Sequence, residues 1–150
     1  MEMDCGVDRY GNNFTSLNGK YHSFDDKPSI ISPNGVQLWH NNGILHRDGD
    51  QPAMIRPDGT RMWYKEGKYH RDNDLPAVIN ARGNQSWYQN GKLHRDGDQP
   101  AVVRANGHQE WWFNGKTHRE NKPAIIYANG QADWFVDGEF IKHVDCEDQS

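Results

Sequence analysis

The sequence has 150 residues, of which 34% are hydrophobic and 11% aromatic, and a formal net charge of −4 at pH 7. So small a charge gives no basis for binding nucleic acid or an anionic membrane surface. The hydrophobic share is low for one compact core, but the six tryptophans exclude a disordered chain, because disordered segments are poor in aromatic residues. No hydrophobic run reaches the roughly 18 residues of a transmembrane helix.

The same residue types recur about every 24 positions along almost the whole chain. Trp occurs at positions 39, 63, 87, 111 and 134, so its steps are 24, 24, 24 and 23 residues. His recurs at 22, 46, 70, 94 and 118, and Pro at 28, 52, 76, 100 and 123. Such a period indicates a repeat architecture, in which each unit buries its apolar side chains only against its neighbours.

The first predicted element is a degenerate half-unit over residues of about 7–18. Gly11 is in phase with Gly35, but Thr15 stands where the later units have Trp. Terminal repeats are atypical because one of their sides faces water. We therefore expect an N-terminal cap over about 7–18, followed by repeats over about 19–138.

Within each repeat, short apolar runs alternate with turn signals. Ala101–Ala105 precedes Asn106-Gly107, and His108–Phe113 precedes Asn114-Gly115. Asn-Gly between two such runs favours a hairpin with a type I′ turn, which needs positive φ at both central residues. The sequence therefore predicts an all-β fold, an elongated antiparallel β-meander of about six 24-residue hairpin units in a single domain over 1–150.

The longer connection in each unit has a different composition. The segment Arg47–Pro52 carries Asp-Gly-Asp and a Pro that cannot donate to a strand ladder, so we expect a bulge or corner there. The equivalent segment His118–Pro123 is one residue shorter. After the last repeat we expect a C-terminal strand and an acidic tail over 139–150.

The two cysteines, Cys5 and Cys146, lie at opposite ends of the chain. In a linear array they are too far apart for a disulfide, which requires Cα atoms within roughly 7 Å. Two free thiols are typical of a reducing compartment, and the first residues lack a secretory signal. The sequence therefore predicts a cytoplasmic protein.

The recurring pattern Trp-x-x-Asn-Gly-Lys-x-His, followed by an apolar strand and Asp/Asn-Gly, resembles a MORN repeat over about residues 7–143. The variant His94-Arg-Asp-Gly-Asp-Gln-Pro-Ala101 resembles repeats in proteins of large DNA viruses and phages. It departs from the common form, which often has a simple Gly-x-Gly at this point. The resemblance implies a binding or scaffolding module, such as a viral protein that acts on a host component in the host cytoplasm.

Strand alternation predicts two aromatic rows on opposite faces of the sheet. The tryptophans form one row, and the residues that follow them form the other. The second row is either core, covered by loops or by coiling of the sheet, or an open surface that docks a partner. In the second interpretation the anchors are Tyr64, Tyr88 and Trp112, since Tyr and Trp are enriched at interfaces.

A second candidate site is the repeated His-Arg pair, represented by His70-Arg71 and His94-Arg95. One interpretation is structural, with His packed under a turn and donating to a carbonyl, and Arg paired with an Asp of the same or the next unit. The alternative is a basic groove that binds an anionic ligand such as a nucleotide.

Metal and catalytic sites are not expected. The Asp-Gly-Asp loops lack the further oxygens and the closing Glu of a calcium loop, and the cysteines and histidines lack zinc-finger spacing. Catalysis requires one unique constellation, whereas His, Arg and Asp are copied in every unit. We expect a non-enzymatic module without cofactor that binds a protein partner. The alternatives are a binder of an anionic small ligand and a repeat that self-assembles as a homo-oligomer.

Overall fold

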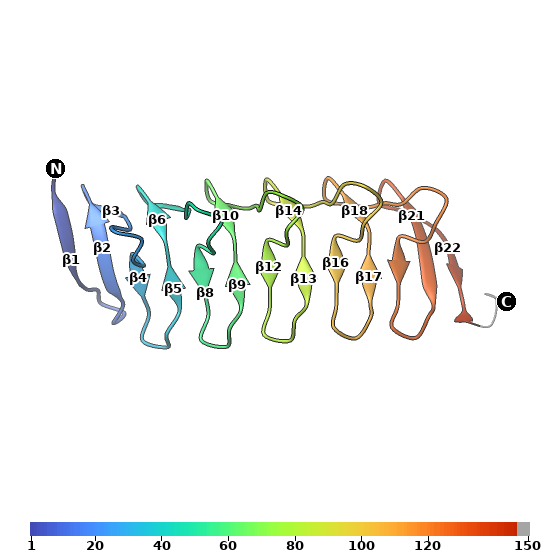
Figure 1. Cartoon of the computed structure of the whole chain (residues 1–150), viewed down its shortest axis with the longest axis horizontal. Coiled ribbons are helices and arrows are strands. Elements are labelled where there is room, and N and C mark those ends of the chain that lie inside the picture. Colours follow the sequence, from blue (N-terminus) through green and yellow to red (C-terminus); the bar gives the residue numbers. More distant parts are fainter. Residues whose placement is uncertain (147–150) are drawn as a thin grey trace.

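The computed structural model describes residues 1–146 and is built from strands and turns. Fourteen strands form one antiparallel sheet, in which neighbours along the chain are also neighbours in space, in the order β1-β2-β4-β5-β8-β9-β12-β13-β16-β17-β20-β21-β22 with β3 beside β2. Figure 1 shows one elongated row of hairpins with the two termini at opposite ends. The predicted all-β fold and elongated meander are confirmed.

The strands of this main sheet are short except at its two ends. They are β1 (Met3–Val7), β2 (Asn13–Leu17), β3 (Lys20–Tyr21), β4 (Ile30–Ile31), β5 (Gln37–Leu38), β8 (Met54–Ile55), β9 (Arg61–Met62), β12 (Val78–Ile79), β13 (Gln85–Ser86), β16 (Val102–Val103), β17 (Gln109–Glu110), β20 (Ile125–Ile126), β21 (Ala132–Val136) and β22 (Glu139–Val144).

Each internal unit also contains a second, separate hairpin of two short strands. These hairpins are β6 (His40–Asn41) with β7 (Ile44–Leu45), β10 (Tyr64–Lys65) with β11 (Lys68–Tyr69), β14 (Tyr88–Gln89) with β15 (Lys92–Leu93), and β18 (Trp112–Phe113) with β19 (Lys116–Thr117). Figure 1 shows them along one long border of the main sheet. A unit therefore has four strands, where the sequence predicted two.

The extra break falls at the repeated Trp. The backbone N–H of Trp87 donates to Ala101 O at 2.7 Å, while its C=O accepts from His94 N at 3.1 Å. Trp87 thus belongs to neither ladder and joins the main sheet to the small hairpin. The chain bends at Trp87, whose indole is buried. Its bonding partner Ala101 is fully buried, so there is no room for a larger side chain at that position.

The two kinds of turn in a unit differ. Asn90 and Gly91 both have positive φ, 50° and 84°, as a type I′ turn requires. At the other end of the unit, only Gly107 has positive φ, at 92°, and its N–H donates to Arg104 O at 2.9 Å. That geometry is a type I turn closed by a Gly bulge, so the type I′ prediction is wrong for Asn106-Gly107.

Strand register separates the side chains of the main sheet onto two faces. Val78 lies opposite Met62 and Ser86, while Ile79 lies opposite Arg61 and Gln85. The first row continues as Ile30, Leu38, Met54, Met62, Val78, Ser86, Val102 and Glu110, and the second as Ile31, Gln37, Ile55, Arg61, Ile79, Gln85, Val103 and Gln109. Successive residues of each apolar strand therefore lie on opposite faces of the sheet.

The core is a strip between the main sheet and the small hairpins. It consists mainly of the tryptophans at 39, 63, 87 and 111, which are 4% to 7% exposed, and the fully buried alanines at 53, 77, 101 and 124. At the N-terminus β1 begins at Met3, before the predicted cap. At the C-terminus β22 is the predicted strand, and residues 147–150 of the predicted acidic tail lie outside the described residues.

The two cysteines are free and exposed; Cys5 lies in β1 and Cys146 follows β22, the first and last strands of the main sheet. Among residues 1–146 there is no helix of the length and apolar character needed to cross a membrane.

Candidate functional site

Each long loop is fastened to its neighbour by a three-residue arrangement, which we call the clamp. In the unit around Trp87, the indole Nε1–H donates to the backbone oxygen of Asp74 at 3.0 Å. The Arg95 guanidinium carbon lies 3.9 Å from the centre of the Trp87 ring. The same guanidinium donates to both carboxylate oxygens of Asp74, through Nε at 2.8 Å and Nη2 at 3.0 Å.

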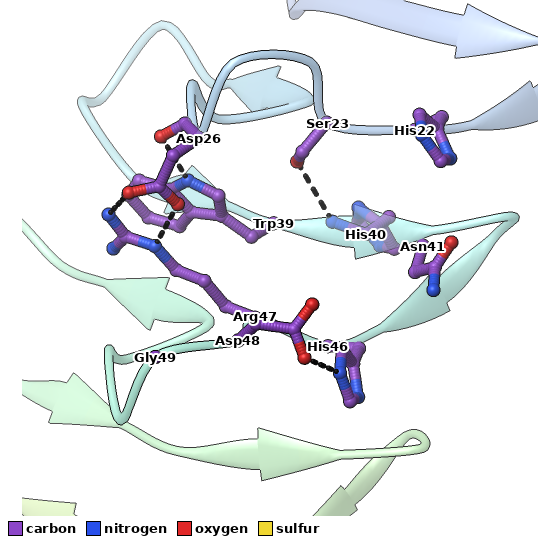
Figure 2. A pocket seen from close by; sticks show the side chains of 10 residues that line it. All are labelled: His22, Ser23, Asp26, Trp39, His40, Asn41, His46, Arg47, Asp48 and Gly49. Carbon is purple, nitrogen blue, oxygen red and sulfur yellow. Dashed lines mark hydrogen bonds and ion pairs between the residues drawn. The ribbon is translucent and has the colours of Figure 1, made fainter.

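The clamp joins successive units, because Asp74 precedes Arg95 by 21 residues. It recurs with Asp26, Trp39 and Arg47, which Figure 2 shows, and around Trp63 and Trp111. Arg therefore pairs with an Asp, as expected, but with one in the preceding unit and not in the same or the next unit.

Electrostatics and stacking both hold the arginine in place. The Arg95 side chain is 15% exposed, and its Nη1 donates to Pro100 O at 3.0 Å. Hydrogen bonding to Arg95 lowers the pKa of Asp74, and the equivalent arginines lower the pKa of Asp26, Asp50 and Asp98. A stacked, bidentate guanidinium of this kind is rigid and is not replaceable by Lys.

The repeated histidine has a defined tautomer. His94 Nδ1 accepts from the backbone N–H of Asn114 in the next unit at 3.1 Å, so its proton is on Nε2. Nε2 then donates to Asp96 at 2.9 Å. The same bonds recur at His46 and His70. The expectation that His donates to a carbonyl is wrong, because the imidazole instead accepts a turn N–H from the adjacent unit.

Shallow pockets lie between successive loops, on the side of the clamps. One of them has a volume of about 410 Å³, and Figure 2 shows it lined by His22, Ser23, His40 and Arg47, among others. Pockets at the equivalent place in later units are about 200 to 270 Å³. In the pocket of Figure 2, Ser23 stands at the position of the repeated Arg.

The predicted anionic-ligand residues, His70, Arg71, His94 and Arg95, all lie among the long loops and their clamps, which we call the loop layer. Both arginines are directed at Asp carboxylates and both histidines donate to a further Asp. The structure therefore brings the four residues to one side of the molecule, but with carboxylates already at the positions that an anion would occupy.

The rings of the other predicted site residues contact a different set of side chains, although Tyr64 and Trp112 also line two of the shallow pockets. Tyr69 stacks between Tyr64 and Tyr88, with ring centres 4.5 and 4.9 Å away, and its hydroxyl contacts Met62 Sδ at 3.7 Å. Trp112 Nε1 donates to Glu110 at 2.8 Å. Met62 and Glu110 belong to the first side-chain row, so these rings share its face, which we call the aromatic face.

The aromatic face is half-buried over most of its length. Tyr64, Tyr88 and Trp112 are all partly exposed, as are the aliphatic side chains beside them, Met54, Val78 and Val102. Burial raises the pKa of Tyr88 and Tyr64, and a hydrogen bond with Tyr69 raises the pKa of Tyr64 further. The tyrosine hydroxyls are therefore neutral hydrogen-bonding groups at any physiological pH.

Towards the C-terminus the aromatic face becomes polar. Glu110, whose side chain is 15% exposed, accepts from His108 and Trp112 and lies near Arg104. Two strands further on, Asp133 accepts from Tyr127 at 2.7 Å, and His143 contacts the same carboxylate. Glu110 and Asp133 occupy equivalent positions before Trp111 and Trp134, where the earlier units have no acidic residue, so this part of the face is specific to one end of the array.

Sequence reasoning missed Tyr69 and Glu110. Tyr69 occupies a position where other units have Tyr21, Leu45, Leu93 and Thr117, so an aromatic residue occurs there in only some of the units. Glu110 stands where other units have Leu38, Met62 and Ser86. The available signal in both cases is the departure from the repeat, which is informative only once the face is known.

No group of three or more His, Cys, Asp or Glu side chains suited to a metal ion occurs in the part of the chain that the structure describes. No protein-family model matches the sequence, and no curated protein matches it.

Proposed function

We propose that this chain is a non-enzymatic repeat module that binds a protein partner through the aromatic face, with Tyr64, Tyr88 and Trp112 at the centre of the contact. The observation that carries the proposal is the asymmetry between the two aromatic rows. The long loops and their clamps bury the Trp row, whereas nothing among residues 1–146 covers the row that follows it to the same extent.

The chemistry of the face supports a protein ligand. Half-exposed Tyr and Trp side chains offer large apolar area with a polar tip, which is the composition of interface hot spots. The Tyr64–Tyr69–Tyr88 stack fixes these rings before binding, so little side-chain entropy is lost when a partner docks. The resemblance to MORN repeats points the same way, towards a binding or scaffolding role.

The anionic-ligand alternative has less support. A ligand in the loop layer must displace Asp50 from Arg71 or Asp74 from Arg95, and both bonds are bidentate. It also meets the exposed carboxylates of Asp72 and Asp96. Only an anion with strong guanidinium affinity overcomes that competition.

A peptide library displayed on phage and selected on the immobilised protein supplies a defined probe. One selected peptide is then titrated against the variant Tyr64→His/Tyr88→His, which uses the residue present at the equivalent His40 and so keeps the strand geometry. Affinity is expected to fall at least tenfold, or about 1.4 kcal/mol. The matched control, Arg61→Ala/Gln85→Ala, changes the opposite face and is expected to stay within about twofold of the wild type.

Two outcomes contradict the proposal. If the control variant loses binding while the tyrosine variant keeps it, the partner docks on the other face. If binding is lost in Arg71→Gln/Arg95→Gln and falls steeply with salt, the loop layer is an anion site, since screening weakens charge contacts and leaves apolar ones intact.

A further inference from the structure

One edge of the main sheet carries unpaired backbone groups. Among the residues that the structure describes, strand β1 is the first in the sheet and pairs only with β2, in the register Met3↔Leu17 to Val7↔Asn13. At its two ends, Asn18 N donates to Glu2 O at 2.8 Å, and Asp8 N donates to Asn12 O at 3.0 Å.

Those two bonds fix which backbone groups face outwards. Hydrogen-bonded and non-bonded pairs alternate along an antiparallel ladder, so the even-numbered residues of β1 bond to β2. The N–H and C=O groups of Met3, Cys5 and Val7 therefore point to the open edge. Such an edge is a template for another strand unless charge, Pro or a bulge protects it.

The β1 edge has little of that protection, since Asp4 is its one charged residue. It has no Lys or Pro, and its side chains Met3 and Val7 are 70% and 66% exposed. The opposite edge, β22, is different, because it contains Lys142 and its pairing with β21 has a bulge between Trp134 and Phe135. The two ends of the array are thus unequal in their capacity to pair.

We infer that a second copy of this chain docks on the β1 edge through a two-fold axis, so that β1 pairs with β1 and the two sheets become continuous. Strand direction selects this arrangement. β1 and β22 are the first and thirteenth strands of an antiparallel path and therefore run in the same direction. A copy stacked head to tail would meet β1 in parallel, whereas a two-fold axis gives the antiparallel pairing of the rest of the sheet.

Within the strand itself, charge favours one register. With the axis at Cys5, Met3 lies opposite Val7 and Asp4 lies opposite Gly6 of the other copy. A shift of two residues either way keeps the bonding pattern but sets Asp4 against Asp4 or against Asp8. In the register with the axis at Cys5, Glu2 and Asp8 meet just beyond the strand. There the Asp8 carboxylate already accepts hydrogen bonds from Tyr10 N at 2.8 Å and Asn12 N at 3.0 Å.

This register places the two Cys5 residues as a hydrogen-bonded pair with Cα atoms about 5.5 Å apart, on the same face of the joined sheet. A short bifunctional maleimide spans that distance. We use the variant Cys146→Ser, which removes the only other thiol, at the far end of the array. Treatment is expected to give a covalent dimer, and light scattering on the untreated protein is expected to rise from 17.3 kDa towards twice that mass with concentration.

Two substitutions separate backbone pairing from other causes. Cys5→Ala keeps every backbone group and is expected to remain dimeric while losing the cross-link. Cys5→Pro removes only an outward N–H, so the β1–β2 ladder is kept, and a monomer is expected at all concentrations. Amide hydrogen exchange of Cys5 and Val7 in the unmodified protein, slower at high than at low concentration, tests the same pairing without any substitution.

A monomer up to about 1 mM, exchange of Cys5 and Val7 that does not change with concentration, or a Cys5→Pro variant that stays dimeric would each overturn the inference. The variant Tyr64→His/Tyr88→His is expected to dimerise like the wild type, because the aromatic face takes no part in the edge. The outcome of this test is therefore independent of the proposed function.

Discussion

At the scale of single residues, the same 24-residue template gives adjacent aromatic side chains opposite fates. Trp87 is 6% exposed and is held by Asp74 and Arg95, whereas Tyr88 is half-exposed and is held mainly by ring contact with Tyr69. The two residues differ because the long loop covers the face that carries Trp87. Strand alternation places them on opposite faces but does not predict which face is covered.

The first prediction compares these two neighbours. Trp87→Ala is expected to lower the free energy of unfolding by about 3–5 kcal/mol, since it removes a buried indole and leaves Arg95 without its stacking surface. Tyr88→Ala is expected to cost about 1–2 kcal/mol, for partial burial plus one ring contact. Urea unfolding followed by circular dichroism measures both. Equal losses at the two positions would contradict the assignment of one row to the core and the other to the surface.

The second prediction concerns pH and the buried His40, whose Nδ1 lies 2.7 Å from Ser29 Oγ. Burial lowers the pKa of His40 below its ordinary value of 6.5, so the folded state favours the neutral ring. Its contribution to stability is therefore present above pH 6.5 and is lost as the pH falls through the lowered pKa.

Urea unfolding of the wild type and of His40→Phe between pH 7.5 and pH 4.5 tests this sign. The difference in unfolding free energy between the two proteins is expected to move in favour of His40→Phe as the pH falls. The other histidines are common to both proteins and cancel in that difference. A gap that is constant across the range would show that His40 titrates alike in the folded and unfolded chains.

At the scale of the element, the small hairpins depend on turns with an unusual backbone. Gly91 has φ 84°, and a Cβ added there would lie 3.5 Å from Lys68 Cβ in the preceding unit. The third prediction is that Gly91→Ala lowers the free energy of unfolding by about 1–2 kcal/mol, the usual cost of a left-handed conformation for a residue with a Cβ. Thermal unfolding measures it.

The matched control is Gly6→Ala in strand β1, where φ is not positive and the nearest atom to an added Cβ is Phe14 Cε1 at 3.5 Å, an ordinary contact. Its unfolding free energy is expected to change by less than about 0.5 kcal/mol. If both substitutions destabilise equally, the cost comes from the added volume and not from the turn.

Sequence patterns within one unit predicted some features of the strands and turns but not others. The period of 24, the hairpin turns and the alternation of Val78 and Ile79 were predictable because each is encoded within one unit. The break at Trp87 was not, because residues 85–89 read as one continuous strand and the bend is set by contacts with Asp74, Arg95 and Ala101.

The candidate site was likewise predictable from the sequence only in part. The positions of Tyr64, Tyr88 and Trp112 on one face followed from alternation. That the opposite row is the covered one depends on bonds between residues 21 apart, from Arg95 to Asp74, which no pattern within a unit specifies.

At the scale of the whole molecule, the clamps make each unit interchangeable with its neighbours. Asp50 stands 24 residues before Asp74 and already makes the same bonds to Arg71 that Asp74 makes to Arg95. Deletion of residues 67–90 removes one whole period and joins Glu66 to Gly91. Glu66 has φ 51°, close to the 50° of the Asn90 it replaces, so the turn is kept, and Asp50 comes to lie 21 residues before Arg95.

The last prediction is that this 24-residue deletion folds. In a repeat array, stability is roughly a sum of units and their interfaces, so the shortened chain is expected to unfold at a lower urea concentration with unchanged spectroscopic signals. Its length is expected to fall by about 10 Å from roughly 60 Å, since thirteen strands about 4.8 Å apart make up the long axis. Small-angle scattering of the monomer measures the change, and a radius of gyration of the full chain near the roughly 15 Å of a compact 150-residue globule would contradict the elongated array.

Deletion of only residues 79–90 is the control: half a period leaves Arg95 without an Asp at the required distance, and this variant is expected to lose the cooperative transition. If the two deletions behave alike, the contacts between units do not carry the stability that the clamps imply.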